Sequence, residues 1–206
     1  MGLIILGGAV STPAFDPRLH RYTVDGKEVP SVSSILRILT DAVYGPIPKE
    51  TLAAAAELGT AVHACTEYLD EGELDRTSVS EDWVPYLAAY EAWKRDMSPQ
   101  IEAIELRLGC PRFCGTLDRI VTLGGEPWII DLKTTSEIHP HVGVQLAAYE
   151  ALASALNGGI RYRRAALQLR SDGTYRFREF SDRADETCFN ALLGIHYWGI
   201  KHGRNI

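Results

Sequence analysis

The sequence predicts an α/β protein, and a hairpin followed directly by a helix carries this prediction. Segments 113–123 and 128–133 are rich in β-branched and apolar residues. Gly124-Gly125 between them is typical of a two-residue hairpin turn, because glycine accepts the positive φ that such turns require. Residues 142–157 then follow helical spacing, and Asn157-Gly158-Gly159 ends them as a C-cap signal.

The remaining elements alternate in the same way. Residues 1–10 are apolar but lack a basic start, so we expect a strand or a disordered segment rather than a signal peptide. Asp25-Gly26 predicts a short hairpin within 15–29, and Ser31 or Ser33 caps a short helix. In order, we expect a helix at 32–39, a loop at 41–48, a helix at 49–69, an acidic solvated connection at 70–82, a helix at 84–97, a strand at 101–108, strands at 160–169 and 175–180, and a helix at 182–202.

The register of the central hairpin brings three polar side chains together. With Gly124-Gly125 as a two-residue turn, Asp118 lies opposite Asp131, whereas a four-residue loop places Asp118 opposite Lys133. Both registers put the three side chains on one face, because strand side chains alternate with a period of two. Facing carboxylates repel, and a lysine or a divalent cation relieves that repulsion. The alternative is a surface Asp–Lys pair at a strand end.

Two helices add polar residues at helical spacing. Gln145 and Tyr149 are four apart and share a face, although Tyr149 could equally be a core aromatic residue with Gln145 solvated beside it. His63 and Glu67 are also four apart, next to the apolar stripe of the 49–69 helix. They form either a surface pair or an imidazole ligand with an orienting carboxylate. Gly59 in this helix costs about 1 kcal/mol relative to alanine, which close approach of another element would explain.

These motifs resemble the PD-(D/E)xK nuclease superfamily. Asp118, then Asp131-Leu132-Lys133, then Gln145 and Tyr149 follow its order, and the Gln-x-x-x-Tyr element resembles the RecB-like exonuclease branch. His63 on an upstream helix matches that branch too, and residues 22–36 resemble the start of phage-encoded members. Leu117 stands where proline often precedes the first acid, and Asp131 replaces the more usual glutamate.

The resemblance implies a fold and a site. The fold is a mixed central β-sheet flanked by helices on both faces, the restriction-endonuclease-like core, in a single nuclease domain over 1–206. Its helical segment 49–97 packs on, or is inserted before, the sheet core 101–180. The implied metal ligands for Mg²⁺, with Mn²⁺ able to substitute, are His63, Asp118, Asp131 and the Leu132 carbonyl. Glu105 is a further candidate with which Glu102 competes, and Glu67 would lie in the second layer around His63. Catalytic roles fall to Asp118, Asp131 and Lys133, while Gln145 and Tyr149 hold the substrate backbone or steady Lys133.

Net charge is the main argument against a nucleic-acid substrate. The formal charge is −6, which disfavours binding to a polyanion. The negative charge is concentrated in 41–105, which has 14 acidic and 4 basic residues, and the flanking segments are net positive. The most basic region is the second hairpin, and we expect its arginines to contact DNA phosphates unless it is simply a solvated edge. The candidates are Arg161, Arg163, Arg176 and Arg178.

Composition bounds the remaining possibilities. No run approaches the ~18 apolar residues of a membrane helix, so no membrane partner is expected. Some RecB-like nucleases bind an iron–sulfur cluster through four cysteines, three near the C-terminus; only Cys188 lies there, so we expect no cluster. Reduced thiols favour the cytoplasm, that of a bacterial host for a phage protein. The predicted function is a DNA exonuclease of phage recombination or DNA processing, working with a phage single-strand-binding or recombination protein. The alternatives are an inactive DNA-binding module and a metal-dependent hydrolase of nucleotides.

Overall fold

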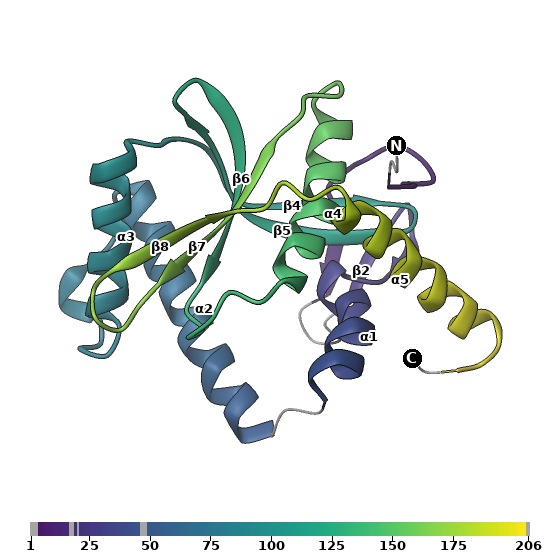
Figure 1. The fold of residues 1–206 in the computed structure, drawn as a ribbon, viewed down its shortest axis with the longest axis horizontal. Helices are drawn as coiled ribbons and strands as arrows, with labels where there is room; N and C mark the ends of the chain where they lie inside the picture. Colours follow the sequence, from purple (N-terminus) through teal and green to yellow (C-terminus); the bar gives the residue numbers. More distant parts are fainter. Residues whose placement is uncertain (1–3, 17–18, 20, 46–48, 205–206) are drawn as a thin grey trace.

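A five-stranded sheet forms the centre of the protein (Figure 1). The computed structural model describes residues 4–16, 19, 21–45 and 49–204. β6 and β7 are parallel, and every other neighbouring pair in this sheet is antiparallel, so the sheet is mixed as predicted. The strand order follows the chain: β4 (Gln100–Cys110), β5 (Phe113–Leu123), β6 (Glu126–Lys133), β7 (Arg163–Leu169) and β8 (Tyr175–Glu179).

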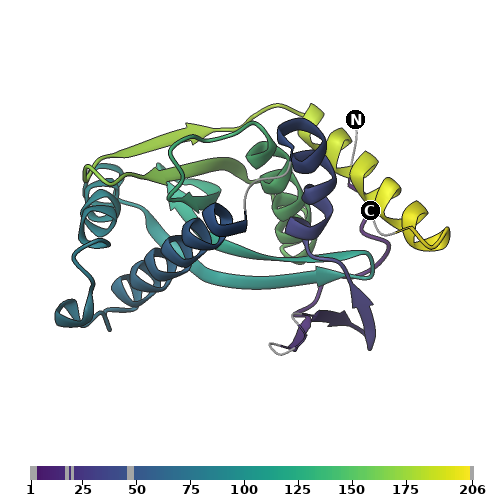
Figure 2. The same cartoon turned by 90° about the horizontal axis from the view of Figure 1, so that it is seen from below.

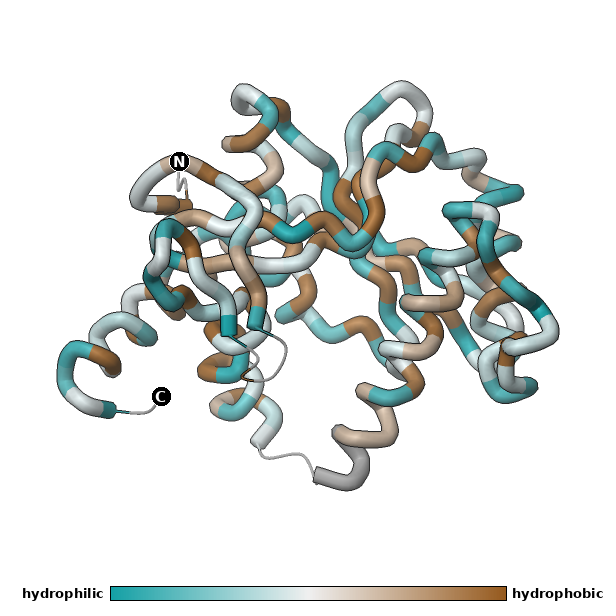
Figure 3. Tube along the Cα trace, turned by 180° about the vertical axis from the view of Figure 1, so that it is seen from behind, coloured by the Kyte–Doolittle hydropathy of each residue, from teal (hydrophilic) through white to brown (hydrophobic). Residues whose placement is uncertain are grey.

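Helices cover both faces of the sheet, which confirms the predicted fold class (Figure 2). One buried apolar cluster joins the sheet to the first group of helices, α1 (Val32–Tyr44), α4 (His141–Leu156) and α5 (Ala184–Lys201). A second cluster joins it to α2 (Lys49–Glu71) and α3 (Val84–Met97), and a short 3₁₀ turn, η1 (Arg76–Ser78), connects these two helices. Hydrophobic residues accordingly gather along the central strands, whereas the outer turns are mostly hydrophilic (Figure 3).

The predicted N-terminal hairpin is part of a small three-stranded sheet. Its strands are β1 (Ala14–Asp16), β2 (Arg21–Val24) and β3 (Lys27–Val29), and the Asp25-Gly26 turn has positive φ at both positions, as a primed turn requires. Single bridges from Ser11 to Gly109 and from Ser31 to Cys114 join this region to the β4–β5 hairpin. Residues 4–10 form no strand, and residues 1–3 of the predicted start lie outside the described part.

Several element boundaries differ from expectation, three of them by more than a residue or two or at a residue of interest. α1 continues to Tyr44 rather than ending at residue 39, so 41–44 are helical, and positions 46–48 of the predicted loop lie outside the described residues. β7 begins at Arg163 rather than at residue 160, and residues 160–162 connect the Gly158-Gly159 turn, where φ is positive, to the sheet. α2 continues through Asp70, which the sequence assigned to a solvated connection.

The strand β5 and the helix α4 fit together at one glycine. A Cβ atom at Gly115 would lie 2.5 Å from Cε1 of Tyr149, closer than real contacts allow. Tyr149 is 4% exposed, so its ring has little space in which to move. The glycine of β5 is therefore what lets α4 approach the sheet at this point.

We expect Gly115→Ala to lower the free energy of unfolding by about 1–3 kcal/mol, as overpacking of a core does. Gly194→Ala in α5 is the matched control, since an added Cβ there meets no described atom within 4 Å. Removing a glycine from a helix interior should stabilise the protein by up to about 1 kcal/mol. Urea unfolding measures both values. A Gly115→Ala variant as stable as the wild type would contradict the tight packing inferred here.

Candidate metal centre

The polar cluster lies where the regular pairing of the sheet is interrupted. β5 and β6 pair in the register of a two-residue turn, from Leu123 opposite Glu126 to Arg119 opposite Ile130. The next position brings Asp118 to Asp131, and there the ladder stops; the Leu132 amide N–H instead donates to Oδ2 of Asp118 at 2.6 Å. Of the two predicted registers, the two-residue turn is the one observed.

The pairing of β5 with its other neighbouring strand, β4, is also irregular near Asp118. Pairing between β4 and β5 skips Glu105, which has a φ of +46° in the middle of a strand. A non-glycine residue in this region costs of order 1–3 kcal/mol, and such strain is concentrated at functional sites. The unusual backbone conformation of Glu105 occurs where its side chain reaches the site from the adjacent strand. The sequence suggested this position for Glu105. Glu102, its competitor, is exposed and instead accepts a hydrogen bond from Thr122.

His63 of α2 completes the group. Its Nδ1 lies 3.5 Å from Oε1 of Glu105 and 3.7 Å from Oδ1 of Asp118, and its Nε2 lies 3.2 Å from the Leu132 carbonyl oxygen. Burial lowers the pKa of His63, but the carboxylates of Asp118 and Glu105 outweigh this effect and raise the pKa to about 9. The imidazole is therefore positively charged at neutral pH and balances the acids around it.

The residues present fit a divalent cation. One ligand atom from each of His63, Glu105 and Asp118 lies within 4.8 Å of the others. Oε1 of Glu105 and Oδ2 of Asp131 are buried, and each lies beside a cationic side chain, His63 at 3.5 Å and Lys133 at 2.7 Å. Buried carboxylate oxygens together with an imidazole and a backbone carbonyl form a donor set that suits Mg²⁺ or Mn²⁺. Binding requires the neutral imidazole, so a cation would displace the His63 proton.

Lys133 and Asp131 form a connected cluster with α4. Nζ of Lys133 lies 2.7 Å from Oδ2 of Asp131 and donates to Oε1 of Gln145 at 3.3 Å. The amide nitrogen of Gln145 donates to Oδ1 of Asp131 at 2.9 Å and to the Tyr149 hydroxyl at 3.0 Å. Burial lowers the pKa of Lys133, but Asp131 and Asp118 more than offset this, and the net pKa is raised. Lys133 is thus a charged ammonium group, and Gln145 holds it in place.

A buried arginine beneath the site is one residue that the sequence reasoning missed. Arg119 is fully buried, and it donates to the Asp118 carbonyl at 2.7 Å, to Asp70 at 2.8 Å and to Thr66 at 3.0 Å. Thr66 in turn donates to the His63 carbonyl at 2.8 Å. Arg119 therefore ties the strand that carries Asp118 to the helix that carries His63. The available signal was the spacing of Asp70, seven residues or two helical turns after His63.

A groove opens beside the histidine. Its volume is about 360 Å³, and its lining includes Gly59, Thr60, His63, Ala64, Glu67 and Glu105. Glu67 faces this groove without a hydrogen bond or ion pair among the described residues, while the two ring nitrogens of His63 face other groups. The predicted role of Glu67 in orienting His63 has no contact to support it. Gly59 faces Thr134, the residue after Lys133, with the hydroxyl oxygen 3.7 Å from an added Cβ.

The four arginines predicted to bind DNA fall into two pairs. Arg161 forms ion pairs with Glu150 and Glu186, and Arg163 forms ion pairs with Glu126 and Glu179, which offset their charges. Arg176 and Arg178 lie on β8, two strands from β6. In the sheet register, Arg176 pairs with Gln168 of β7, which pairs with Lys133, and Arg178 pairs with Ala166, which pairs with Asp131. Arg178 donates to the Ile138 carbonyl, whereas Arg176 is exposed and makes no ion pair within the described residues.

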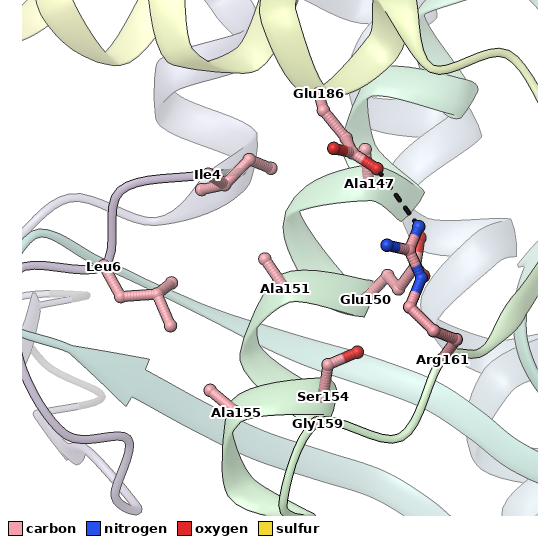
Figure 4. Close-up of a pocket in the computed structure, with 10 residues that line it drawn as sticks. All are labelled: Ile4, Leu6, Ala147, Glu150, Ala151, Ser154, Ala155, Gly159, Arg161 and Glu186. Atoms are coloured by element: carbon pink, nitrogen blue, oxygen red, sulfur yellow. Dashed lines mark ion pairs between the residues drawn. The ribbon is translucent and has the colours of Figure 1, made fainter. Parts of the chain in front are cut away.

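A second cavity, of about 220 Å³, lies beside α4 and has a different character (Figure 4). Its walls are apolar apart from Ser154 and the group formed by Glu150, Arg161 and Glu186. It contains none of the residues of the metal centre. Figure 4 shows Arg161 at one side of this cavity, with its guanidinium group directed toward Glu186.

A mixed sheet with clustered acids, a charged lysine and an imidazole is typical of proteins that bind a divalent cation beside an anionic substrate. The chain belongs to the PD-(D/E)XK nuclease superfamily, whose family model matches residues 77–192, more than half of the sequence. Membership suggests a metal-dependent nuclease that hydrolyses phosphodiester bonds of DNA. His63 lies upstream of the matched residues.

Comparisons with individual proteins add little detail. A search of curated proteins found no match. A solved structure described as "Crystal structure of SSO0001" is similar to 89% of this chain and 80% of that chain, with 15% sequence identity and a TM-score of 0.39. Within the described residues, no helix is long and apolar enough to cross a membrane.

The raised pKa of His63 predicts a pH dependence of stability without added cations. Because the folded-state pKa of about 9 exceeds the ordinary value of 6.5, the contribution is complete below about pH 6.5 and is lost as the pH rises through about 9. The loss is at most about 3.5 kcal/mol, since a tenfold change in proton affinity corresponds to about 1.4 kcal/mol. His63→Gln should flatten this part of the profile.

Urea unfolding from pH 6 to pH 9.5 in a chelator measures the effect. His202→Gln, near the end of the described chain and remote from the acids, is the matched control and should retain the wild-type profile. Identical profiles for wild type and His63→Gln would show that the imidazole does not balance the acid cluster.

Proposed function

We propose that the protein is a Mg²⁺-dependent deoxyribonuclease of the RecB-like branch, acting as an exonuclease. The observation that carries this proposal is the convergence of His63, Glu105 and Asp118 beside the Lys133–Gln145 pair. The Gln-x-x-x-Tyr element supports the RecB-like branch, because Gln145 contacts both Asp131 and Lys133 and is supported by Tyr149. We further propose that residues 1–206 form one nuclease domain.

The acidic and the basic side chains of the site have different proposed roles. Glu105, Asp118, Asp131, the Leu132 carbonyl and neutral His63 would hold the cation. When bound, Mg²⁺ supplies Lewis acidity and offsets the negative charge of the phosphate. The Lys133 ammonium group would orient the attacking water and stabilise negative charge that develops in the transition state.

The proposed path of the substrate follows the face of the sheet that carries Lys133. Arg176 lies two strand spacings, roughly 10 Å, from Lys133 and on the same face, which suits a contact to a neighbouring phosphate. The ion pairs of Arg161 and Arg163 make these two weaker candidates. A role in phage recombination or DNA processing in the bacterial cytoplasm, alongside a single-strand-binding or recombination protein, rests on the resemblance of residues 22–36 to phage members.

Asp118→Asn and Lys133→Met should each reduce DNA cleavage by at least about 100-fold, because each removes a charge that stabilises the transition state. The assay is a Mg²⁺ time course on linear DNA labelled at each end, with a circular DNA of the same sequence. Cleavage of linear DNA alone is the result expected of an exonuclease. The same DNA in a chelator should stay intact.

Any of three outcomes would contradict the proposal. Full activity in both variants would show that Asp118 and Lys133 do not take part in catalysis. Hydrolysis of free nucleotides with no cleavage of DNA would favour the nucleotide hydrolase, and DNA binding without cleavage in Mg²⁺ and in Mn²⁺ would favour an inactive binding module.

Two glutamates of the same strand provide a matched test of the cation. Glu105→Gln should raise the Mg²⁺ concentration needed for half-maximal cleavage by about 10-fold or more, since it removes a charged ligand. Glu102→Gln, three residues away on an exposed position, should leave this concentration unchanged. A titration of cleavage rate against Mg²⁺ measures both. Equal shifts in the two variants would mean that Glu105 acts only through general charge.

A further inference from the structure

An aromatic cluster lies at the start of α4, next to the metal centre. The rings of His139 and His141 are nearly parallel, with an interplanar angle of 15° and centroids 5.7 Å apart. Tyr44, the last residue of α1, has its ring centroid 5.0 Å from that of His139 and 5.7 Å from that of His141. Tyr44 is 43% exposed, so the cluster has an open side.

The spacing along α4 places this cluster beside the proposed catalytic residues. His141 is four residues before Gln145 and shares its face of the helix, about one turn or 5.4 Å further along the axis. Gln145 contacts Lys133 and Asp131, so the cluster begins about one turn beyond these groups. Figures 1 and 2 agree that the end of α1, the β6–α4 loop and the start of α4 lie together, across from the N-terminal half of α2.

The chemistry of the cluster suits a nucleobase better than a phosphate. Burial, followed by the charges of His139 and Lys133, lowers the pKa of His141, so its ring is neutral at neutral pH. Nδ1 of His141 is buried and has no hydrogen-bond partner within the described residues, so the ring offers its face rather than this nitrogen to a ligand. Aromatic rings offer every base a surface for stacking, but only when the base is unpaired.

We propose that Tyr44, His139 and His141 form a stacking site for an unpaired base of the strand whose phosphate lies at the metal centre. The proposal rests on the proposed nuclease function and gives it a substrate class, single-stranded DNA or a frayed duplex end. The scissile phosphate would lie on the Lys133 side of Gln145, and the base would lie on the His141 side. A blunt duplex must unpair its end before it can occupy both positions.

Fluorescence anisotropy in a chelator tests this proposal without cleavage. Three probes of equal length are used: a single strand, a blunt duplex and a strand of abasic residues. The wild type should bind the single strand about 5- to 100-fold more tightly than the abasic strand, as stacking on aromatic residues predicts. Tyr44→Ala should lose most of this preference, and Tyr44→Phe, which keeps the ring, should retain it.

Trp198→Ala is the matched control, because Trp198 also stacks on a histidine, His202, on the exposed end of α5 at the opposite side of the molecule from α2 (Figure 1). It should bind all three probes as the wild type does. Equal wild-type affinity for the normal and abasic strands would overturn the stacking site, and so would a Tyr44→Ala variant that keeps the full preference. The same strands incubated with Mg²⁺ test the nuclease separately: absence of cleavage would contradict the proposed function and leave the binding result to stand on its own.

Discussion

Electrostatic balance around three acids is the constraint on which the site depends. Glu105, Asp118 and Asp131 come from three adjacent strands, and the last two are almost fully buried. Bringing carboxylates together in a poorly solvated space is unfavourable unless positive charge compensates. Without a cation, the imidazolium of His63 and the ammonium of Lys133 provide that compensation. A divalent ion could provide the same compensation by binding the carboxylate oxygens. The three clustered acids therefore determine both the stability of the unliganded fold and its capacity to bind metal.

The scaffold holds these charges in place from both faces of the sheet. On the α2 side, the buried pair of Arg119 and Asp70 links Asp118 to the helix that carries His63. On the α4 side, Gln145 forms hydrogen bonds with Lys133 and Asp131. Tyr149 accepts a hydrogen bond from Gln145, and its ring packs against β5 where Gly115 has no side chain. The interrupted pairing at Glu105 and Asp118 frees both side chains from the regular ladder.

Local patterns predicted much of this arrangement, because local geometry determines it. The Gly124-Gly125 turn fixed the register that brings Asp118 to Asp131, and helical spacing placed Gln145 beside Tyr149. Other features depend on tertiary position and left little trace in the sequence. Asp70 reads as the start of an acidic surface segment, yet its side chain is buried against Arg119. The arginines of the second hairpin read as one basic surface, but acids from α4, α5 and β6 pair with two of them.

The proposed function requires that a cation binds among His63, Glu105 and Asp118. Anomalous diffraction from crystals soaked in Mn²⁺ tests it most directly, because the scattering locates the ion without reference to activity. We expect a single strong peak within coordination distance of the three side chains, with Lys133 beside it. A peak elsewhere on the protein, or none at Mn²⁺ concentrations that support cleavage, would contradict it.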